Sequence, residues 1–561
     1  MKRNKYLLLI SSPACLGFLV AAAAKEGLLR PWRSIQASVT GESGPIDIRL
    51  RQIVVPGLRI VDRCVTCHVG MAPGEPSLSG SKVAFSHKPV VHDPAELGCT
   101  VCHAGQGYAT EKADAHGEVR FWPLPMIPVK YSYSGCGSCH TSLKVPNAEI
   151  LERGRKAFER LDCLACHRLD SRGGTFRIGG AHGMEGPDLS RVGASGYDQG
   201  WYEKHLAKSG PGGEPLWRET FAPIDETSLE ELKVYLDSRV GAPGLVEAKA
   251  LFHSLGCRGC HKVNGVGGDD GPDLTKAGER DPGRTDFSGI KGEHTIENWH
   301  KEHLLDPARL VPGSLMPAMG LSREQAEQLT MYIFSLRTSN LPEAFWPKDR
   351  IRVERFGERE FATDGATLYG TFCAACHGTK GQGRHYPGMS FFPSVGNPDF
   401  LALASDRFLT QTITHGRPGR RMPAWGEKEG GLRAEEIREL VSYLRALGGG
   451  VSPPPGVDEP RRWAAGDVKA GARLFETHCS GCHGPNGTGG LAVALNNPGL
   501  LAASDTYLFE TIGRGRSNTV MEGFAKPKST HPALSSAEIE AIVSYIRTWE
   551  ADRGERGASV K

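Results

Sequence analysis

The sequence has few of the features that mark common enzyme classes. It contains no Walker-type phosphate loop, no zinc-protease signature and no recognisable catalytic triad. Lys and Arg total 67 against 64 Asp and Glu, so the net charge of +3 indicates neither a nucleic-acid partner nor an acidic one. Aromatic residues make up only 7%, while 71 glycines and 37 prolines favour small, loop-rich domains. The length of 561 residues predicts roughly three to five such domains.

Cysteine is nearly absent outside one short motif. Of 15 cysteines, only Cys15 lies outside a Cys-x-x-Cys-His pentapeptide, so no pairs remain to form a disulfide framework. Structural zinc sites would need the motifs to combine in pairs to supply four ligands, but there are seven motifs. A thioredoxin-like site would need a βαβ context, and it would not need a histidine after each second cysteine.

The seven motifs match the attachment signal for c-type haem, in which two thiols add to the haem vinyl groups and the following histidine binds the iron. The sequence therefore predicts seven covalently bound haem c groups, which would complete cores that are poor in aromatic residues. The predicted attachment residues are Cys64, Cys67, Cys99, Cys102, Cys136, Cys139, Cys163, Cys166, Cys257, Cys260, Cys373, Cys376, Cys479 and Cys482. The predicted proximal iron ligands are His68, His103, His140, His167, His261, His377 and His483.

The N-terminus predicts a membrane anchor. Three basic residues precede an apolar run from Tyr6 to Ala24, and no later run approaches the length of a bilayer span. Residues 1–25 fit either a cleaved signal peptide or an uncleaved anchor, and we favour the anchor. Haem c attachment in bacteria and the positive-inside rule both place the remaining, soluble part on the periplasmic side. Residues 26–60 are expected to form a stalk.

The spacing of the haem motifs predicts two kinds of region. The first three motifs are crowded, whereas the last four begin at positions 163, 257, 373 and 479, which fits one small domain for each haem. A proline-rich segment, Pro453–Pro455, indicates a semi-rigid linker. We predict a triple-haem module over 61–147, followed by cytochrome-sized domains over 148–241, 242–341, 350–450 and 461–552.

The last four motifs belong to an internal repeat. An aromatic residue precedes each motif by four or five positions, and an amphipathic helix with an aromatic–apolar pair closes each unit. These units resemble class I cytochrome c domains, and Gly186-Pro187 and Gly271-Pro272 resemble the segment beside the proximal histidine of that family. The third and fourth units, with Cys-His-Gly at 376–378 and 482–484, look like the dihaem subunit of cbb-type oxidases. The resemblance implies a mostly α fold of four small all-α domains after a loop-rich N-terminal module.

The N-terminal module is of another kind. Arg63–His68, Gly98–Gly107 and Arg30-Pro31-Trp32 resemble membrane-anchored multihaem cytochromes associated with bacterial quinol-oxidising complexes. The module holds three histidines outside its motifs, His87, His92 and His116, for three haems. We therefore predict bis-His ligation in this module, and the sequence leaves open which histidine serves which iron.

Methionine is the expected sixth iron ligand in three class I units. Met316 lies in a Met-Pro loop, with Met319 as a nearby alternative; Met422 lies in another Met-Pro loop, and Met521 in a less typical one. Lone methionines often only fill cores, but these positions match the distal loop of the family.

The first class I unit breaks this pattern, because Phe221-Ala222-Pro223-Ile224 stands where Met-Pro is expected. His205 follows Trp201 by four positions, but His303 follows Trp299 in the same way in a unit that has Met316, which favours a structural role for His205. His182 and Met184 precede Gly186-Pro187, on the side of the proximal ligand. This haem is expected to have an unusual sixth ligand or an open position.

The sequence predicts an electron-transfer protein rather than an enzyme. Bis-His haems near the membrane and His/Met haems farther along give potentials that rise away from it. We expect electrons to pass from a membrane quinol-oxidising partner to a periplasmic acceptor or a terminal oxidase. One alternative is a reductase with an open haem at Cys163, Cys166 and His167 that acts on peroxide or nitrite. Another is an electron-accepting accessory subunit of an oxidase.

Overall fold

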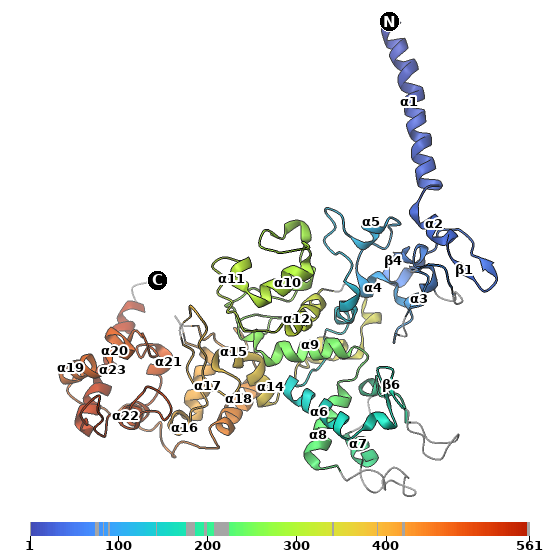
Figure 1. Cartoon of the computed structure of the whole chain (residues 1–561). Helices are drawn as coiled ribbons and strands as arrows, with labels where there is room; N and C mark the ends of the chain where they lie inside the picture. Colours follow the sequence, from blue (N-terminus) through green and yellow to red (C-terminus); the bar gives the residue numbers. More distant parts are fainter. Residues whose placement is uncertain are drawn as a thin grey trace. The chain divides into compact units, whose positions relative to one another are not determined.

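The computed structural model describes most of the chain. The described residues are 2–72, 78–81, 83–87, 90–141, 143–174, 186–195, 199–206, 224–338, 341–389, 391–417 and 421–557. Helices dominate this part, and its strands form three short two-stranded antiparallel ladders (Figure 1). The predicted mostly α fold is confirmed.

The chain divides into two compact units. Unit 1 comprises residues 1–141, 276–288 and 331–356, and unit 2 comprises residues 142–275, 289–330 and 357–561. Unit 1 therefore contains the first three haem motifs, and unit 2 contains the last four. The domain boundaries expected from the sequence are finer than this division and stay a prediction.

Unit 1 is built from short elements and loops. Its ladders pair β1 (Thr40–Gly41) with β2 (Gly44–Pro45) and β3 (Ile53–Val55) with β4 (Ile60–Asp62). Its described α-helices are α1 (Lys2–Gly27), α2 (Pro31–Ala37), α3 (Pro94–Leu97), α4 (Thr100–His103), α5 (Lys112–His116) and α13 (Lys348–Phe356), and a ten-residue 3-10 segment spans Val129–Ser138. Ile53, Val55 and Val65 form a small core. Segments this short bury little apolar surface, which fits a module completed by prosthetic groups.

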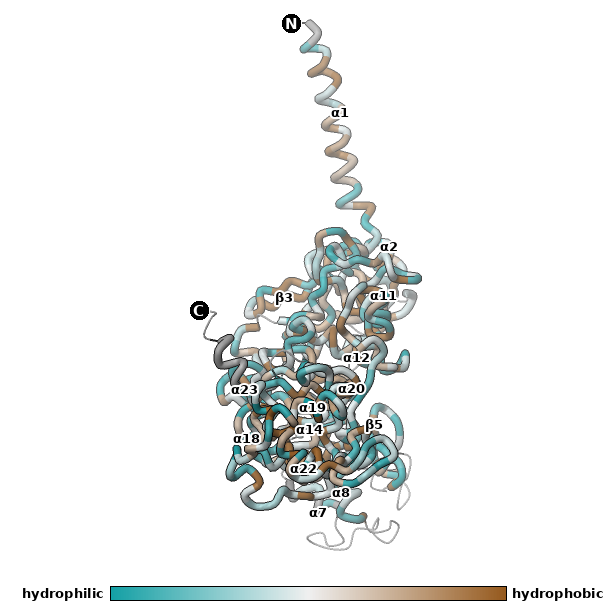
Figure 2. Tube along the Cα trace, turned by 90° about the vertical axis from the view of Figure 1, so that its left-hand side faces the viewer, coloured by the Kyte–Doolittle hydropathy of each residue, from teal (hydrophilic) through white to brown (hydrophobic). Residues whose placement is uncertain are grey.

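Helix α1 is the one described helix that is long and apolar enough to cross a membrane. None of its most apolar stretch is buried against the rest of the protein. Figure 2 shows its apolar residues in brown. The charged residues of α1 lie only at its two ends, and its length and composition are compatible with a bilayer span.

Unit 2 consists of helices joined by long loops. In chain order they are α6 (Ala148–Arg160), α7 (Gln199–Leu206), α8 (Glu226–Asp237), α9 (Pro243–Ser254), α10 (Ile296–Leu305), α11 (Pro307–Leu310), α14 (Gly365–Phe372), α15 (Ala374–His377), α16 (Pro398–Leu401), α17 (Asp406–His415), α18 (Ala434–Leu447), α19 (Val468–His478), α20 (Ser480–His483), α21 (Pro498–Leu501), α22 (Asp505–Arg514) and α23 (Ser536–Gly557). The ladder of β5 (Arg168–Leu169) and β6 (Arg172–Gly173) follows the fourth haem motif. Helix α12 (Arg323–Ser335) crosses the boundary between the units.

Three helix pairs repeat the same crossing: α6 with α8, α14 with α18, and α19 with α23. The aromatic residues identified in the sequence meet there, since the ring centres of Phe158 and Tyr235 lie 5.5 Å apart and those of Phe475 and Tyr545 lie 5.6 Å apart. The equivalent Tyr369–Tyr443 distance is 5.4 Å. The first and last helices of the first, third and fourth repeats therefore pack directly against one another, as in a class I cytochrome c.

The third and fourth repeats share one continuous hydrophobic core. The ring of Tyr507 lies 5.3 Å from that of Phe408 and 6.4 Å from that of Phe400, so a residue of the fourth repeat packs into the third. Asn397 donates a hydrogen bond to the Ser517 carbonyl at 2.9 Å across the same contact. The proline-rich segment thus connects two domains that also touch directly.

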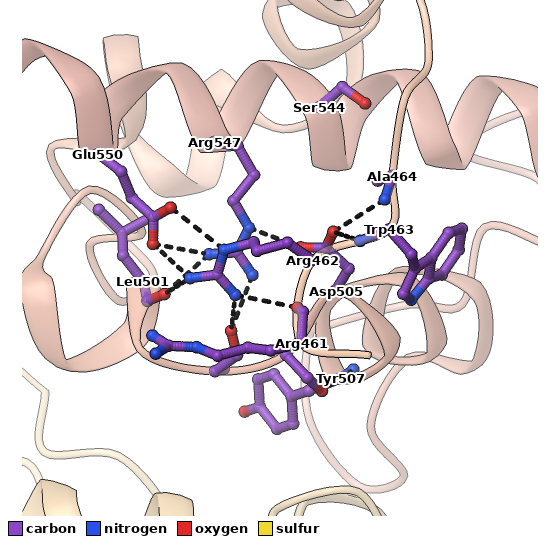
Figure 3. Close-up of polar contacts among 12 residues, drawn as sticks. Arg461, Arg462, Trp463, Ala464, Leu501, Asp505, Tyr507, Ser544, Arg547 and Glu550 are labelled. Carbon is purple, nitrogen blue, oxygen red and sulfur yellow. Dashed lines mark hydrogen bonds and ion pairs between the residues drawn. The ribbon is translucent and has the colours of Figure 1, made fainter. Parts of the chain in front are cut away.

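A buried carboxylate fixes the start of the fourth repeat (Figure 3). Asp505, 1% exposed, accepts hydrogen bonds from the backbone of Trp463 and Ala464 and from Arg547. Arg547 also donates to the Leu501 carbonyl at 2.8 Å. The linker is thereby tied to α22 and α23. Arg445 makes the corresponding contacts with Asp406 and two carbonyls in the third repeat, so the third and fourth repeats share this arrangement.

Candidate haem-binding sites

All seven Cys-x-x-Cys-His motifs fold as the same turn. In each, the backbone N–H of the histidine donates to the carbonyl of the first cysteine at 2.9–3.0 Å. This turn places both thiols and the imidazole on one side of a single helical turn, where one porphyrin can reach all three. Because these residues are so close in sequence, the local backbone alone brings the predicted haem-binding groups together.

The proximal histidines of unit 2 are oriented by backbone carbonyls. The partners of their Nδ1 atoms are the carbonyls of Pro187 (His167, 2.9 Å), Pro272 (His261, 2.8 Å), Pro393 (His377, 2.8 Å) and Val493 (His483, 2.7 Å). A histidine that donates through Nδ1 presents Nε2 as the metal ligand. The Gly-Pro segments recognised in the sequence therefore lie where that resemblance implies.

Glycine is required beside two of these rings. A Cβ atom on Gly186 would lie 2.5 Å from Nδ1 of His167, and one on Gly271 would lie 2.4 Å from Cε1 of His261. Any side chain there would push the imidazole away from the hydrogen bond that orients it. The close approach of backbone to ring fits a histidine held rigidly for a metal.

Two arginines, Arg417 and Arg516, bear on whether these sites suit haem. The Nε atoms of Arg417 and Arg516 are buried and have no hydrogen-bond partner within the described residues. Their charges lower the pKa of His377 and His483, respectively, after the larger effect of burial, which places each guanidinium near a proximal ligand. Burial also lowers the pKa of Arg417. Two half-buried cations beside two haem motifs match the anionic propionates of haem.

Each of the three spare histidines of unit 1 lies near a different proximal histidine. The ring centres of His87 and His103 are 6.1 Å apart, and those of His92 and His140 are 6.2 Å apart. Two imidazoles that bind one metal ion from opposite sides at about 2 Å have ring centres about 6 Å apart. His116 neighbours His68, whose pKa is lowered first by burial and then by the charge of His116.

Two of the expected methionines occupy equivalent loops. The backbone N–H of Arg417 donates to the Met422 carbonyl at 2.9 Å, and that of Arg516 donates to the Met521 carbonyl at 2.8 Å. Met521 therefore corresponds to Met422 although it lacks the following proline. Met316 lies half-buried in the loop between α11 and α12.

The surroundings of the Cys163 motif differ from those of the other haem motifs in unit 2. Phe221, Ala222, Pro223, His182 and Met184 lie outside the described residues. His205 is described, and its ring centre lies 6.2 Å from that of His167 at an angle of 66°. Its ring also stacks on Trp201, with centres 5.0 Å apart and planes 6° apart.

Haem motifs that are distant in sequence touch one another. Cys64 and Cys99 shift each other's pKa, and so do Cys260 and Cys376, so the two thiols of each pair lie close together. Glycines permit this approach, since a Cβ on Gly135 would lie 1.9 Å from the Cys102 carbonyl, joining the second and third motifs. The first three motifs thus form a connected series, and the fifth and sixth form a second one.

The structure adds two residues that the sequence did not single out. Nδ1 of His140 lies 3.0 Å from Oδ1 of Asp349, a residue 209 positions away. Fully buried Asp62 accepts hydrogen bonds from the backbone N–H groups of Cys99 and Thr100 and holds the second motif in place. No local pattern marks either carboxylate, because each acts on a motif far along the chain.

Comparison with known proteins agrees with this geometry. A family model for cytochrome c matches residues 245–337 and 468–550, and one for subunit III of cbb3-type cytochrome c oxidase matches residues 360–444. The chain therefore contains cytochrome c domains, and these imply covalently bound haem c.

Several oxidase and respiratory subunits are similar to parts of the chain. The FixP subunit of a cbb3-type oxidase from Bradyrhizobium sp. (strain ORS 278) is 33% identical over 195 residues, which cover 33% of this chain and 59% of FixP. The CcoP subunit from Azospirillum sp. (strain B510) is 25% identical, over 38% of this chain and 69% of CcoP. The cytochrome c subunit of a Mycobacterium bovis cytochrome bc1 complex is 25% identical, over 36% and 68%. The chain thus spans about three fifths of FixP.

Proposed function

We propose that this protein is a seven-haem electron conduit anchored to the membrane by α1, with its haem domains on the periplasmic side. Unit 1 takes electrons from a membrane quinol-oxidising partner, and unit 2 delivers them to a periplasmic acceptor or a terminal oxidase. The likeness to a bc1-complex subunit supports the donor, and the likeness to cbb3-oxidase subunits supports the acceptor.

The contacts between haem motifs carry this proposal. Haems held by Cys64 and Cys99, or by Cys260 and Cys376, would have neighbouring attachment points, and this closeness would favour direct electron transfer between them. Haem iron supplies the chemistry by changing between two oxidation states. The polypeptide holds the haems in series, orients the axial ligands and excludes water from them.

Axial ligation gives the conduit a direction. We assign His116, His87 and His92 as partners of His68, His103 and His140, which makes the haems of unit 1 bis-His. Met316, Met422 and Met521 ligate the last three irons, and a thioether ligand raises the reduction potential. The Asp349 carboxylate strengthens His140 as a ligand and keeps the third haem at low potential.

A spectroelectrochemical titration of the full-length protein tests this direction. Pyridine haemochrome analysis should first give seven haems for each chain. Asp349→Asn should raise the potential of one low-potential haem by about 60 mV, a tenfold change in a one-electron equilibrium. Met422→His should lower the reduction potential of one high-potential haem. The haem whose reduction potential responds to Asp349→Asn should be one of low potential. If it were among the haems of highest potential, the proposed direction of electron flow would be contradicted.

The rival function is a reductase with an open haem at the Cys163 motif. It requires a vacant coordination position on that iron and a protein group to deliver protons there. The 6.2 Å separation of His167 and His205 speaks against the vacancy. Turnover of peroxide or nitrite by the purified protein, abolished by Cys163→Ser with Cys166→Ser, would favour the reductase.

A further inference from the structure

The haem at the Cys163 motif is the one class I haem for which the sequence offers no methionine ligand. We propose that His205 is its second axial ligand, so that a bis-His haem stands at the start of the class I series. This inference rests on the proposed function only in requiring that haem is attached at Cys163 and Cys166. It replaces the structural role that the sequence favoured for His205.

The separation of the two rings matches a shared iron. The His167–His205 ring centres are 6.2 Å apart, as are those of His92 and His140, and the His87–His103 distance is 6.1 Å. Metal–imidazole bonds of about 2 Å on opposite sides of one ion require about this separation. The 66° angle between the ring planes is compatible with ligation, because each imidazole can rotate about its own bond to iron.

The roles of the two nitrogen atoms of His167 agree with this arrangement. Its Nδ1 is engaged by the Pro187 carbonyl at 2.9 Å, so Nε2 is the atom that remains to bind iron. His205 approaches the ring of His167 from another element, α7, rather than from the proximal loop.

Helix α7 holds His205 in a fixed orientation. Trp201 lies one turn earlier on the same helix face, and its ring is nearly parallel to the imidazole, with centres 5.0 Å apart. The neighbouring Tyr202 is buried and donates a hydrogen bond to Asp237 at the end of α8. A ligand needs such support, since an imidazole that rotates freely loses affinity for its metal.

The second class I unit supplies an internal control. His303 stacks on Trp299 on helix α10, with ring centres 4.8 Å apart and planes 12° apart, in the same Trp-x-x-x-His spacing. That unit has Met316 for its iron, whereas the corresponding loop of the first unit has no methionine. Substitution of His303 therefore removes an equivalent stacked imidazole without removing a proposed ligand.

Spectroscopy of the full-length holoprotein tests the assignment. The wild type should contain only low-spin ferric haem by EPR and should bind no CO when reduced. His205→Ala should produce one high-spin, CO-binding haem for each chain, and added imidazole should restore the low-spin state. His205→Met should stay low-spin but raise one reduction potential. His303→Ala should leave all these spectra unchanged.

Haem counts separate the possible failures. Seven haems in every variant, with all of them low-spin and unreactive to CO in His205→Ala, would overturn the assignment of His205. A high-spin, CO-binding haem already present in the wild type would overturn it too. In a further variant, Cys163 and Cys166 are both replaced by serine. If that variant contains as many haems as the wild type, haem attachment at this motif is contradicted, and with it the proposed seven-haem conduit.

Discussion

At the scale of single residues, buried charges tie the fifth and sixth haem motifs together. Arg258, inside the Cys257–His261 motif, is fully buried and forms an ion pair with Glu360, which lies ahead of the sixth motif. Lys249 adds a second cation 3.6 Å from the same carboxylate. Taking charges out of water is costly, so a pair like this one stabilises the fold only while both partners are ionised.

Replacement of Glu360 should therefore destabilise unit 2 in a pH-dependent way. Burial alone raises the pKa of Glu360, but Arg258 and Lys249 lower it below the ordinary value of 4.5. The ionised carboxylate thus stabilises the folded state above that value, and this stabilisation disappears as the pH falls through the lowered pKa. Glu360→Gln should cost about 3–5 kcal/mol in unfolding free energy at neutral pH, because two buried cations lose their partner.

Chemical denaturation at neutral and acidic pH measures this difference. The destabilisation by Glu360→Gln should shrink in acid, where the wild-type carboxyl group is itself protonated. Glu427→Gln, at an exposed position of the third repeat, is the matched control and should change little at either pH. A pH-independent effect of Glu360→Gln would show that lost packing, and not the ion pair, explains it.

At the scale of elements, glycines set the distance between the first and last helix of a repeat. Gly154, Gly365 and Gly471 each precede the core aromatic residue by four positions, and each faces a carbonyl of the partner helix. A Cβ on Gly471 would lie 2.0 Å from the Ala541 carbonyl oxygen. The second repeat has fully buried Ala248 at the corresponding position before Phe252.

Gly471→Ala should accordingly weaken the fourth repeat. Alanine favours a helix over glycine by about 1 kcal/mol, but overpacking against a rigid backbone costs about 1–3 kcal/mol, so we expect net destabilisation of up to about 2 kcal/mol. Thermal unfolding followed by circular dichroism measures the change. In Gly513→Ala the new Cβ would meet its neighbours at 3.7 Å or more, so that variant should be neutral or stabilised. Equal stability of the two variants would contradict a close helix crossing.

At the scale of the whole molecule, the described chain consists of one apolar helix and two compact units that carry the Cys-x-x-Cys-His motifs. Charged residues are frequent outside α1, and α1 is the only described helix suited to a bilayer. The proposed membrane attachment and the proposed electron transfer therefore reside in separate parts of the sequence. An electron carrier of this kind needs its anchor for location and not for the chemistry of its haems.

Removal of residues 2–27 should release the protein without altering its haems. The truncated chain requires a cleavable signal peptide in their place, because haem c is attached outside the cytoplasm. We expect the full-length protein in the membrane fraction and the truncated one in the periplasmic extract, with the same haem content and the same absorption spectrum. Recovery of the full-length protein in the soluble extract would contradict an anchoring role for α1.

The sequence by itself determined the mostly α fold, the class I repeats and the haem attachment motifs, since these depend on residues within a few helical turns. It also predicted the Gly-Pro segments, and their carbonyls contact His167 and His261. Only the tertiary structure decided which histidines lie opposite one another, that Asp349 faces His140, and that Cys260 meets Cys376. The physical reason is that two ligands of one iron, or two adjacent haems, come from segments that loops of any length can join, so their partnership appears only when the chain is folded.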